Sequence, residues 1–178
     1  VFKDTTTRTM TVQDNGIGMN REDLIDNLGT IARSGTAALM EKVKAAGSEK
    51  DKLSLIGQFG VGFYASFMVA TKVEVISRKA GEDQAWHWES DGRTGFTVRE
   101  AESDEAGELD STRGTVIRIH IDDNSSEFLI DEKLKQVILT YSDHIDIPIY
   151  LGKPEEKGEG EEDAPVNRAS ALWTRSKQ

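Results

Sequence analysis

The sequence predicts an α+β fold, a two-layer sandwich in which helices cover one mostly antiparallel sheet. Short β-type segments follow one another between 73 and 121, separated by turns rich in glycine, aspartate and serine. Helical periodicity of apolar residues comes before them, on either side of Gly29, and after them, from Ser126 to His144. Because helices and strands come in groups, we expect layers rather than a mixed arrangement.

The first strand is predicted at 9–13, where apolar and polar residues alternate. It runs directly into a turn at Asp14-Asn15-Gly16. Asn20 then offers an N-terminal cap to a helix that carries acidic residues near its positive end. Gly29 ends this helix, so Asp14 is expected in the turn between the strand and the helix. The apolar face of the helix is formed by Leu24, Ile25 and Leu28.

A second helix is predicted at 36–46, where Gly47 stops it. The polar segment that follows has the composition of a movable flap, and a buried helix is predicted at 61–70. One long amphipathic helix is expected at 126–144, and a last strand at 147–151. Four further strands are predicted at 73–76, 84–89, 96–98 and 116–121.

The domain organisation follows from composition. One folded domain is predicted at 1–152, then a charged flexible linker at 153–168 and the start of another domain at 169–178. The chain begins with Val1 rather than methionine, so we expect a piece of a longer protein. The longest apolar run, at 61–70, is shorter than the roughly 20 residues that span a bilayer, so no membrane segment is expected.

The acidic balance limits the possible partners. With 22 basic and 32 acidic residues the net charge is -10, which argues against a surface that binds nucleic acid through many phosphates. The absence of cysteine excludes disulfides and thiolate metal sites and favours a reducing compartment.

His120 is expected to be a hydrogen-bonded strand residue, and Trp86 and Trp88 are expected to pack in the core. The histidines show no metal-ligand spacing: His87, His120 and His144.

Two glycine-rich motifs indicate a nucleotide pocket. The first, from Asp14 to Met19, places a lone carboxylate beside flexible backbone. A carboxylate only accepts hydrogen bonds and the exocyclic amino group of adenine only donates them, so Asp14 is the leading candidate for reading the base. The second motif, from Gly57 to Phe63, offers backbone N–H groups to phosphates at the start of a helix.

Each motif also has a structural interpretation. Asn15-Gly16 is a common hairpin-turn pair, although a helix rather than a second strand follows it. The glycines of the second motif have the reverse of the dinucleotide-fingerprint spacing, and close helix packing explains small residues there equally well. Arg33 either reaches a phosphate or lies exposed at a helix end.

Four stretches together closely resemble the ATP-binding domain of the heat-shock protein 90 chaperones, and the bacterial high-temperature protein G type is nearest. They are Asp14–Met19, Asn27–Thr36, Ile56–Tyr64 and Arg113–Thr115. The first is shared with gyrase B, MutL-type repair proteins and sensor histidine kinases, whereas the second and third are more specific to the chaperone. The resemblance covers Thr9 through Arg175. It implies a left-handed βαβ-containing sandwich, ATP between helices, and a mobile lid at about 34–57.

The resemblance also implies roles for the matching residues. Asp14 would bind the adenine amino group. The other residues to which it gives nucleotide-binding roles are Gly18 and Thr115 (ordered waters), Met19 and Leu28 (packing on the base), Asn27 (ribose and phosphates), and Gly57, Gln58, Phe59, Gly60, Val61, Gly62 and Phe63 (backbone N–H groups around the phosphates). Arg33 is added to the expected site from its position beside the flap.

In the family, a strand and a long helix before the first motif carry a glutamate that activates the attacking water and an asparagine that holds Mg²⁺. Both are expected upstream of Val1, so the chain is expected to be N-terminally truncated, with no catalytic residue and no metal ligand of its own. The parent protein would be a weak ATPase that binds ATP or ADP with Mg²⁺.

The implied function is that of a cytoplasmic, homodimeric chaperone that acts on unfolded or partly folded clients, without nucleic-acid or membrane partners. One rival is the ATP module of a sensor histidine kinase or of a topoisomerase or repair protein. Another is a non-catalytic binding module, which the missing glutamate and asparagine would suit. The acidic net charge and the stretch Asn27–Thr36 favour the chaperone over the first rival.

Overall fold

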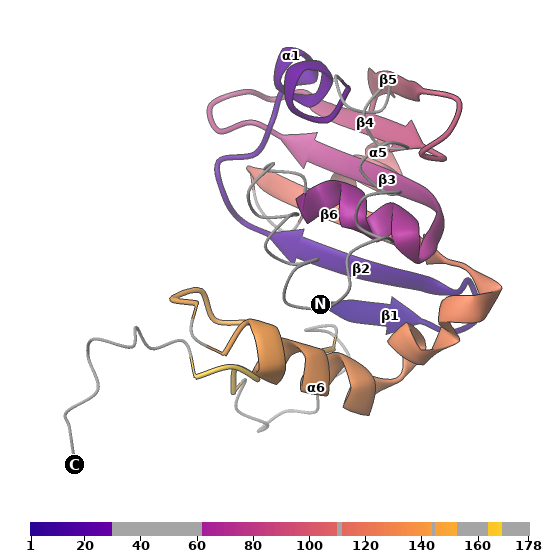
Figure 1. The fold of residues 1–178 in the computed structure, drawn as a ribbon. Helices are drawn as coiled ribbons and strands as arrows, with labels where there is room; N and C mark the ends of the chain where they lie inside the picture. The colour runs from indigo at the N-terminus through magenta and orange to yellow at the C-terminus, as the bar shows by residue number, and fades with distance from the viewer. Residues whose placement is uncertain (30–61, 110–111, 144, 153–163, 169–178) are drawn as a thin grey trace.

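The computed structural model describes residues 1–29, 62–109, 112–143, 145–152 and 164–168. This part of the chain is built on a six-stranded antiparallel sheet with helices packed against it, which confirms the predicted α+β sandwich (Figure 1). In sheet order the strands are β1 (Phe2–Asp4), β2 (Thr9–Asp14), β6 (Gly114–Ile121), β3 (Ala70–Arg78), β4 (Ala85–Ser90) and β5 (Phe96–Glu100).

The predicted meander corresponds to β3, β4 and β5, which pair in succession. β6 then returns to the centre of the sheet and pairs with both β2 and β3. Its β-branched residues suit a central strand that has a paired strand on each side. β1 was not predicted from the sequence; it forms the sheet edge and pairs only with β2 among the described strands.

One face of the sheet is covered by α1 (Arg21–Leu24), the π-helical turn η1 (Ile25–Gly29) and the 3₁₀-helix η2 (Gly62–Met68), which lies in front of the strands in Figure 1. Trp88 is buried in the core on this face and Trp86 packs against it, as predicted. η2 is shorter than the predicted helix because β3 already begins at Ala70. The buried members of this core are Leu24, Leu28, Val73, Val75, Trp88, Ile119, Ile121 and Leu129.

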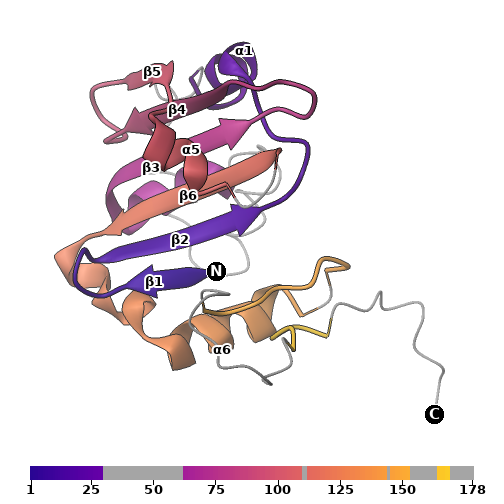
Figure 2. The same cartoon turned by 180° about the vertical axis from the view of Figure 1, so that it is seen from behind.

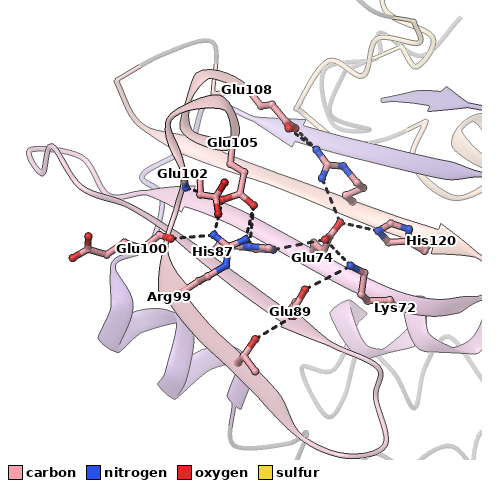
Figure 3. A network of polar contacts seen from close by, with 12 residues as sticks. Lys72, Glu74, His87, Glu89, Arg99, Glu100, Glu102, Glu105, Glu108 and His120 are labelled. Carbon is pink, nitrogen blue, oxygen red and sulfur yellow. Dashed lines mark hydrogen bonds and ion pairs between the residues drawn. The ribbon is translucent and has the colours of Figure 1, made fainter. Parts of the chain in front are cut away.

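The opposite face carries α5 (Ser103–Gly107), a short helix that the sequence did not predict (Figure 2). Beneath it lies a smaller apolar cluster of Ile76, Ala85, Leu109 and Val116. Polar and charged side chains occupy neighbouring positions of β3, β4 and β6 on this face (Figure 3). The two faces therefore differ in chemistry, one apolar and the other largely ionic.

The segment predicted as one long helix forms two, η3 (Asp123–Leu129) and α6 (Asp131–Tyr141). Ile130 separates them because its backbone is extended, with φ -109° and ψ 126°. Acidic residues in the first turn of α6 favour a new helix start there. α6 lies beside the β1 edge of the sheet (Figures 1 and 2), where Lys3 Nζ and Asp131 Oδ2 are 2.9 Å apart.

The predicted strand at 147–151 is not formed, although its backbone is hydrogen-bonded. Val166 donates to the Ile149 carbonyl at 2.7 Å, and the N-terminal amine donates to the Tyr150 carbonyl at 2.7 Å. Asn167, only 2% exposed, accepts from Ile149 N at 2.8 Å through its side-chain oxygen. Bonds to an asparagine side chain and to isolated carbonyls replace a regular strand ladder.

Several predicted features lie outside the described residues. These are the helix at 36–46, the lid at 34–57, the larger part of the linker and the start of another domain at 169–178. Among the helices that are described, none is both long and apolar enough to cross a membrane.

Candidate nucleotide-binding site

The strand pairing brings Asp14, Thr115 and Ser77 into one row across the sheet. Asp14 is the Cα partner of Thr115, and Thr115 is the partner of Ser77 on its other side. Paired residues of neighbouring strands point to the same face. Ser77 lies two residues after Val75 in β3 and therefore points to the same face. Val75 belongs to the core under α1 and η1, so the polar row lies on that helix-covered face. We call these three residues the polar row.

Ser77 is the centre of the polar row and was not identified from the sequence. It is fully buried, and its hydroxyl donates to the Gly114 carbonyl at 2.9 Å. It also accepts from the Met19 N–H at 2.8 Å and lies 2.9 Å from Thr115 Oγ1. A serine hydroxyl has one proton, so Thr115 must donate to Ser77 in this arrangement. The Thr115 oxygen is thereby oriented as an acceptor.

Two glycines let the loop after β2 cross the ends of the strands. Gly18 has φ +68°, and a Cβ there would lie 1.8 Å from the Arg78 carbonyl oxygen. Gly114 has φ +132°, and its Cβ would lie 2.3 Å from the Asp14 carbonyl oxygen. Only glycine combines these backbone angles with such close approach. The motif glycine Gly18 is therefore required by packing against β3 as well as by the turn.

Asp14 itself ends β2 and is exposed in the described structure. Its Oδ1 accepts from the Gly16 N–H at 2.8 Å, which fixes the turn. Arg113 donates from Nη1 to the carbonyls of Asn15 and Gly16, the latter at 2.8 Å. Backbone and side chain thus hold the carboxylate at the end of the polar row.

The two residues expected to pack on a base adjoin the apolar core. Leu28 is buried within it and Met19 is packed against it. Asn27, expected near the ribose and phosphates, is exposed in the π-helical turn η1. Such turns inside helices are frequent at functional sites. Tyr64 ties η1 to η2, because its hydroxyl donates to the Leu28 carbonyl at 2.5 Å.

Only the end of the second glycine motif can be placed. Gly62 is exposed at the start of η2, and Phe63 turns its ring into the core, edge-on to Trp88 at a centroid distance of 5.5 Å. The ring of Phe63 therefore serves packing, and its backbone is the part left for a ligand. The other expected residues of this group lie outside the described residues: Arg33, Gly57, Gln58, Phe59, Gly60 and Val61.

An ionic tether holds the start of α1 against the β3–β4 turn. The Asn20 side chain caps the helix by accepting from Asp23 N at 3.0 Å, and the Asp23 carboxylate in turn accepts from Asn20 N at 3.2 Å. Lys79 Nζ lies 2.8 Å from Asp23 Oδ2. The hydrogen bond from Lys79 and the Asn20 N–H hold the pKa of Asp23 below its ordinary value. The start of α1, which continues into the η1 turn that carries Leu28, is thereby anchored next to the loop of Gly18.

Comparison with protein families defines the class. Residues 1–115 match the family of histidine kinase-, DNA gyrase B- and HSP90-like ATPases. The chain therefore belongs to this ATPase family. The matched region contains the whole polar row, from β2 through the start of β6.

Individual relatives are more specific. The chaperone protein HtpG of Rhodospirillum rubrum is 53% identical over 169 residues, which cover 94% of this chain and 25% of the relative. HtpG of Bordetella avium is 47% identical over 183 residues, with 99% and 28% covered. HtpG of Rickettsia rickettsii is 52% identical over 166 residues, with 93% and 25% covered. These matches confirm the resemblance to heat-shock protein 90 chaperones, and the chain spans about a quarter of the length of these relatives.

Proposed function

We propose that the polar row is the base-reading wall of an ATP site. The Asp14 carboxylate would accept from the exocyclic amino group of adenine. The Thr115 oxygen, turned into an acceptor by its bond to Ser77, would take part through an ordered water, together with the backbone at Gly18. The observation that carries this proposal is the lateral register of Asp14, Thr115 and Ser77 on the helix-covered face.

Apolar contact and phosphate binding would complete the site. Met19 and Leu28 border the core beside the row, where a flat base could pack on them. Asn27 would lie near the ribose and phosphates. The backbone from Gly57 to Phe63 would bind the phosphates, with Arg33 as a further contact, and 34–57 would act as a lid.

We also infer a role for the whole protein, of which this chain would be the nucleotide-binding part. The HtpG relatives favour an ATP-dependent chaperone over a kinase or topoisomerase module, both of which the same family includes. It would hydrolyse ATP weakly, form a homodimer and act on unfolded client proteins in the cytoplasm. Mg²⁺ would neutralise the phosphates; its asparagine ligand and the general-base glutamate are expected upstream of Val1.

The test is calorimetric titration of the full-length product of the gene with Mg-ADP. Asp14→Asn exchanges a charged acceptor for a neutral amide and should weaken binding about 10- to 100-fold. Asp104→Asn is the matched control, since Asp104 is exposed on α5 across the sheet, and should leave the affinity unchanged. Equal ADP affinity in Asp14→Asn and the unmodified protein would refute the assigned adenine contact.

A further inference from the structure

The face of the sheet opposite the polar row carries an ionic cluster that nucleotide binding does not use. Glu74 of β3 lies directly across from Glu89 of β4 and from Arg118 of β6. His87 and His120 enter the cluster from β4 and β6 (Figure 3). Although these histidines are far apart in the sequence, strand pairing places both beside one buried carboxylate. Sequence spacing gave no sign of this arrangement.

The two oxygens of Glu74 have different surroundings. Oε2 is held by His120 Nε2 at 2.7 Å and by Arg118 Nη1 at 3.3 Å. Arg118 is itself neutralised by Glu108, whose Oε1 lies 2.6 Å from Nη2. Oε1 faces Lys72 Nζ at 2.7 Å. One oxygen is thus held by two side chains, while the other faces the Lys72 ammonium group and, at 3.9 Å, His87 Nε2.

Lys72 lies between two carboxylates that would otherwise repel each other. Its Nζ is 2.7 Å from Glu74 Oε1 and 3.6 Å from Glu89 Oε2. Carboxylates directly opposite on neighbouring strands are destabilising unless a cation lies between them. The Lys72 side chain is 40% exposed, so it can swing into solvent. The position of its ammonium group, between two carboxylates, is therefore one where another cation could bind.

His87 supplies a nitrogen ligand aimed at this position. Its side chain is 4% exposed, and neither ring nitrogen makes a hydrogen bond. Nε2 lies 3.9 Å from Glu74 Oε1, and Nδ1 lies 3.1 Å from Glu105 Oε1. Buried polar atoms that make no hydrogen bond are rare, so each needs an explanation.

We propose that Glu74, His87 and Glu89 bind a divalent transition-metal ion, with zinc as the best match, and that Lys72 holds the same place in the metal-free protein. One ligand atom from each residue lies within 4.8 Å of the others. Imidazole and carboxylate donors suit zinc, which takes three protein ligands and a water in open sites. Glu105 beside Nδ1 would act as the carboxylate that orients a metal-bound histidine.

The ion can reach this site from solvent. Lys72 and Glu89 border an open hollow of about 290 Å³, and the Glu89 side chain is 40% exposed, with a hydrogen bond from Thr97 Oγ1 to its Oε1 at 3.4 Å. The ion would link β3 to β4 in the middle of the ionic face. This site does not depend on nucleotide binding, because it lies on the other face of the sheet.

The test uses the 178-residue chain after chelator treatment, because it has no cysteine and only three histidines. Titration with Co²⁺ should give the visible absorption of a tetrahedral site, and Zn²⁺ should abolish it at about one ion per chain. Glu89→Gln, a change at the half-exposed rim, should weaken Zn²⁺ binding about 10- to 100-fold. His87→Gln should abolish the tetrahedral Co²⁺ spectrum.

A gain of affinity separates this proposal from mere misfolding of variants. Lys72→Met removes the competing ammonium group and should tighten Zn²⁺ binding about tenfold. Lys79→Met, which removes a lysine paired with Asp23 of α1 rather than with the ionic cluster, is the matched control and should leave the Zn²⁺ affinity unchanged. No saturable Zn²⁺ binding, or equal affinity in the Lys72 and Lys79 variants, would overturn the proposed site.

Discussion

Replacing Ser77 by alanine removes the hydrogen-bonding centre of the polar row while leaving its strand intact. The hydroxyl is fully buried and bonds to the Gly114 carbonyl, the Met19 N–H and the Thr115 hydroxyl. Without it, a partly buried N–H and a buried carbonyl each lose a partner, at about 1–3 kcal/mol for a group left unsatisfied. We therefore expect the free energy of unfolding to fall by about 2–4 kcal/mol.

The assay is urea unfolding followed by tryptophan fluorescence, with Ser126→Ala as the matched control. Ser126 is exposed; its hydroxyl donates to the Asp123 carbonyl at 2.9 Å and accepts from Arg8 Nη2 at 3.1 Å. Because water can replace both exposed bonds, its loss should cost about 0.5 kcal/mol or less. Folded Ser77→Ala should also bind Mg-ADP about fivefold more weakly, because the Thr115 hydroxyl is no longer oriented. If the two serine variants unfold at the same urea concentration, Ser77 does not organise the site.

Two further substitutions test the loop and the tether. Gly18→Ala should cost clearly more stability than Gly81→Ala in thermal unfolding. Both residues have a positive φ, which costs a non-glycine residue about 1–2 kcal/mol, but of the two only Gly18 would bring the new Cβ against a carbonyl oxygen, at 1.8 Å. Similar melting temperatures of the two variants would contradict this clash. Asp23→Asn should destabilise the protein above pH 4 and progressively less as the pH falls, since a carboxyl with a lowered pKa contributes its stabilisation above its unfolded-state pKa and loses it on protonation. A difference from the unmodified protein that is constant from pH 7 to about pH 2 would show that the charge of Asp23, paired with Lys79, is not the cause.

The strands were predictable where a local pattern decides the structure. β3, β4, β5 and β6 carry runs of β-branched and aromatic residues between turns, and each was predicted near its observed position. β1 was missed because three residues with two charges carry no strand pattern. Its pairing with β2 is a tertiary choice that the segment alone does not encode.

Helix ends and the last segment were less predictable. The periodicity of apolar residues continues through Ile130 even though the backbone there is extended, so the sequence could not reveal two helices. At 147–151 an apolar run suggested a strand, but Asn167 and the N-terminal amine provide its hydrogen-bond partners instead. Such partners are set by contacts between distant parts of the chain.

The candidate sites depend on sheet order, which the sequence does not disclose. Asp14 and Thr115 were selected from motifs, and the structure places them side by side, although their role in binding stays a prediction. Ser77 was missed because a serine within a strand carries no motif. The cluster around Glu74 was also missed, because His87 and His120 come to lie beside Glu74 only after β4 and β6 pair with β3.

The most direct measurement is a crystal structure of the full-length protein with bound ADP. The Asp14 carboxylate should accept from the adenine amino group, with Thr115 within reach of a bridging water and Ser77 still bonded to Met19 N. Adenine seated elsewhere, or bound with the Asp14 carboxylate turned away from it, would contradict the polar row as the base-reading wall.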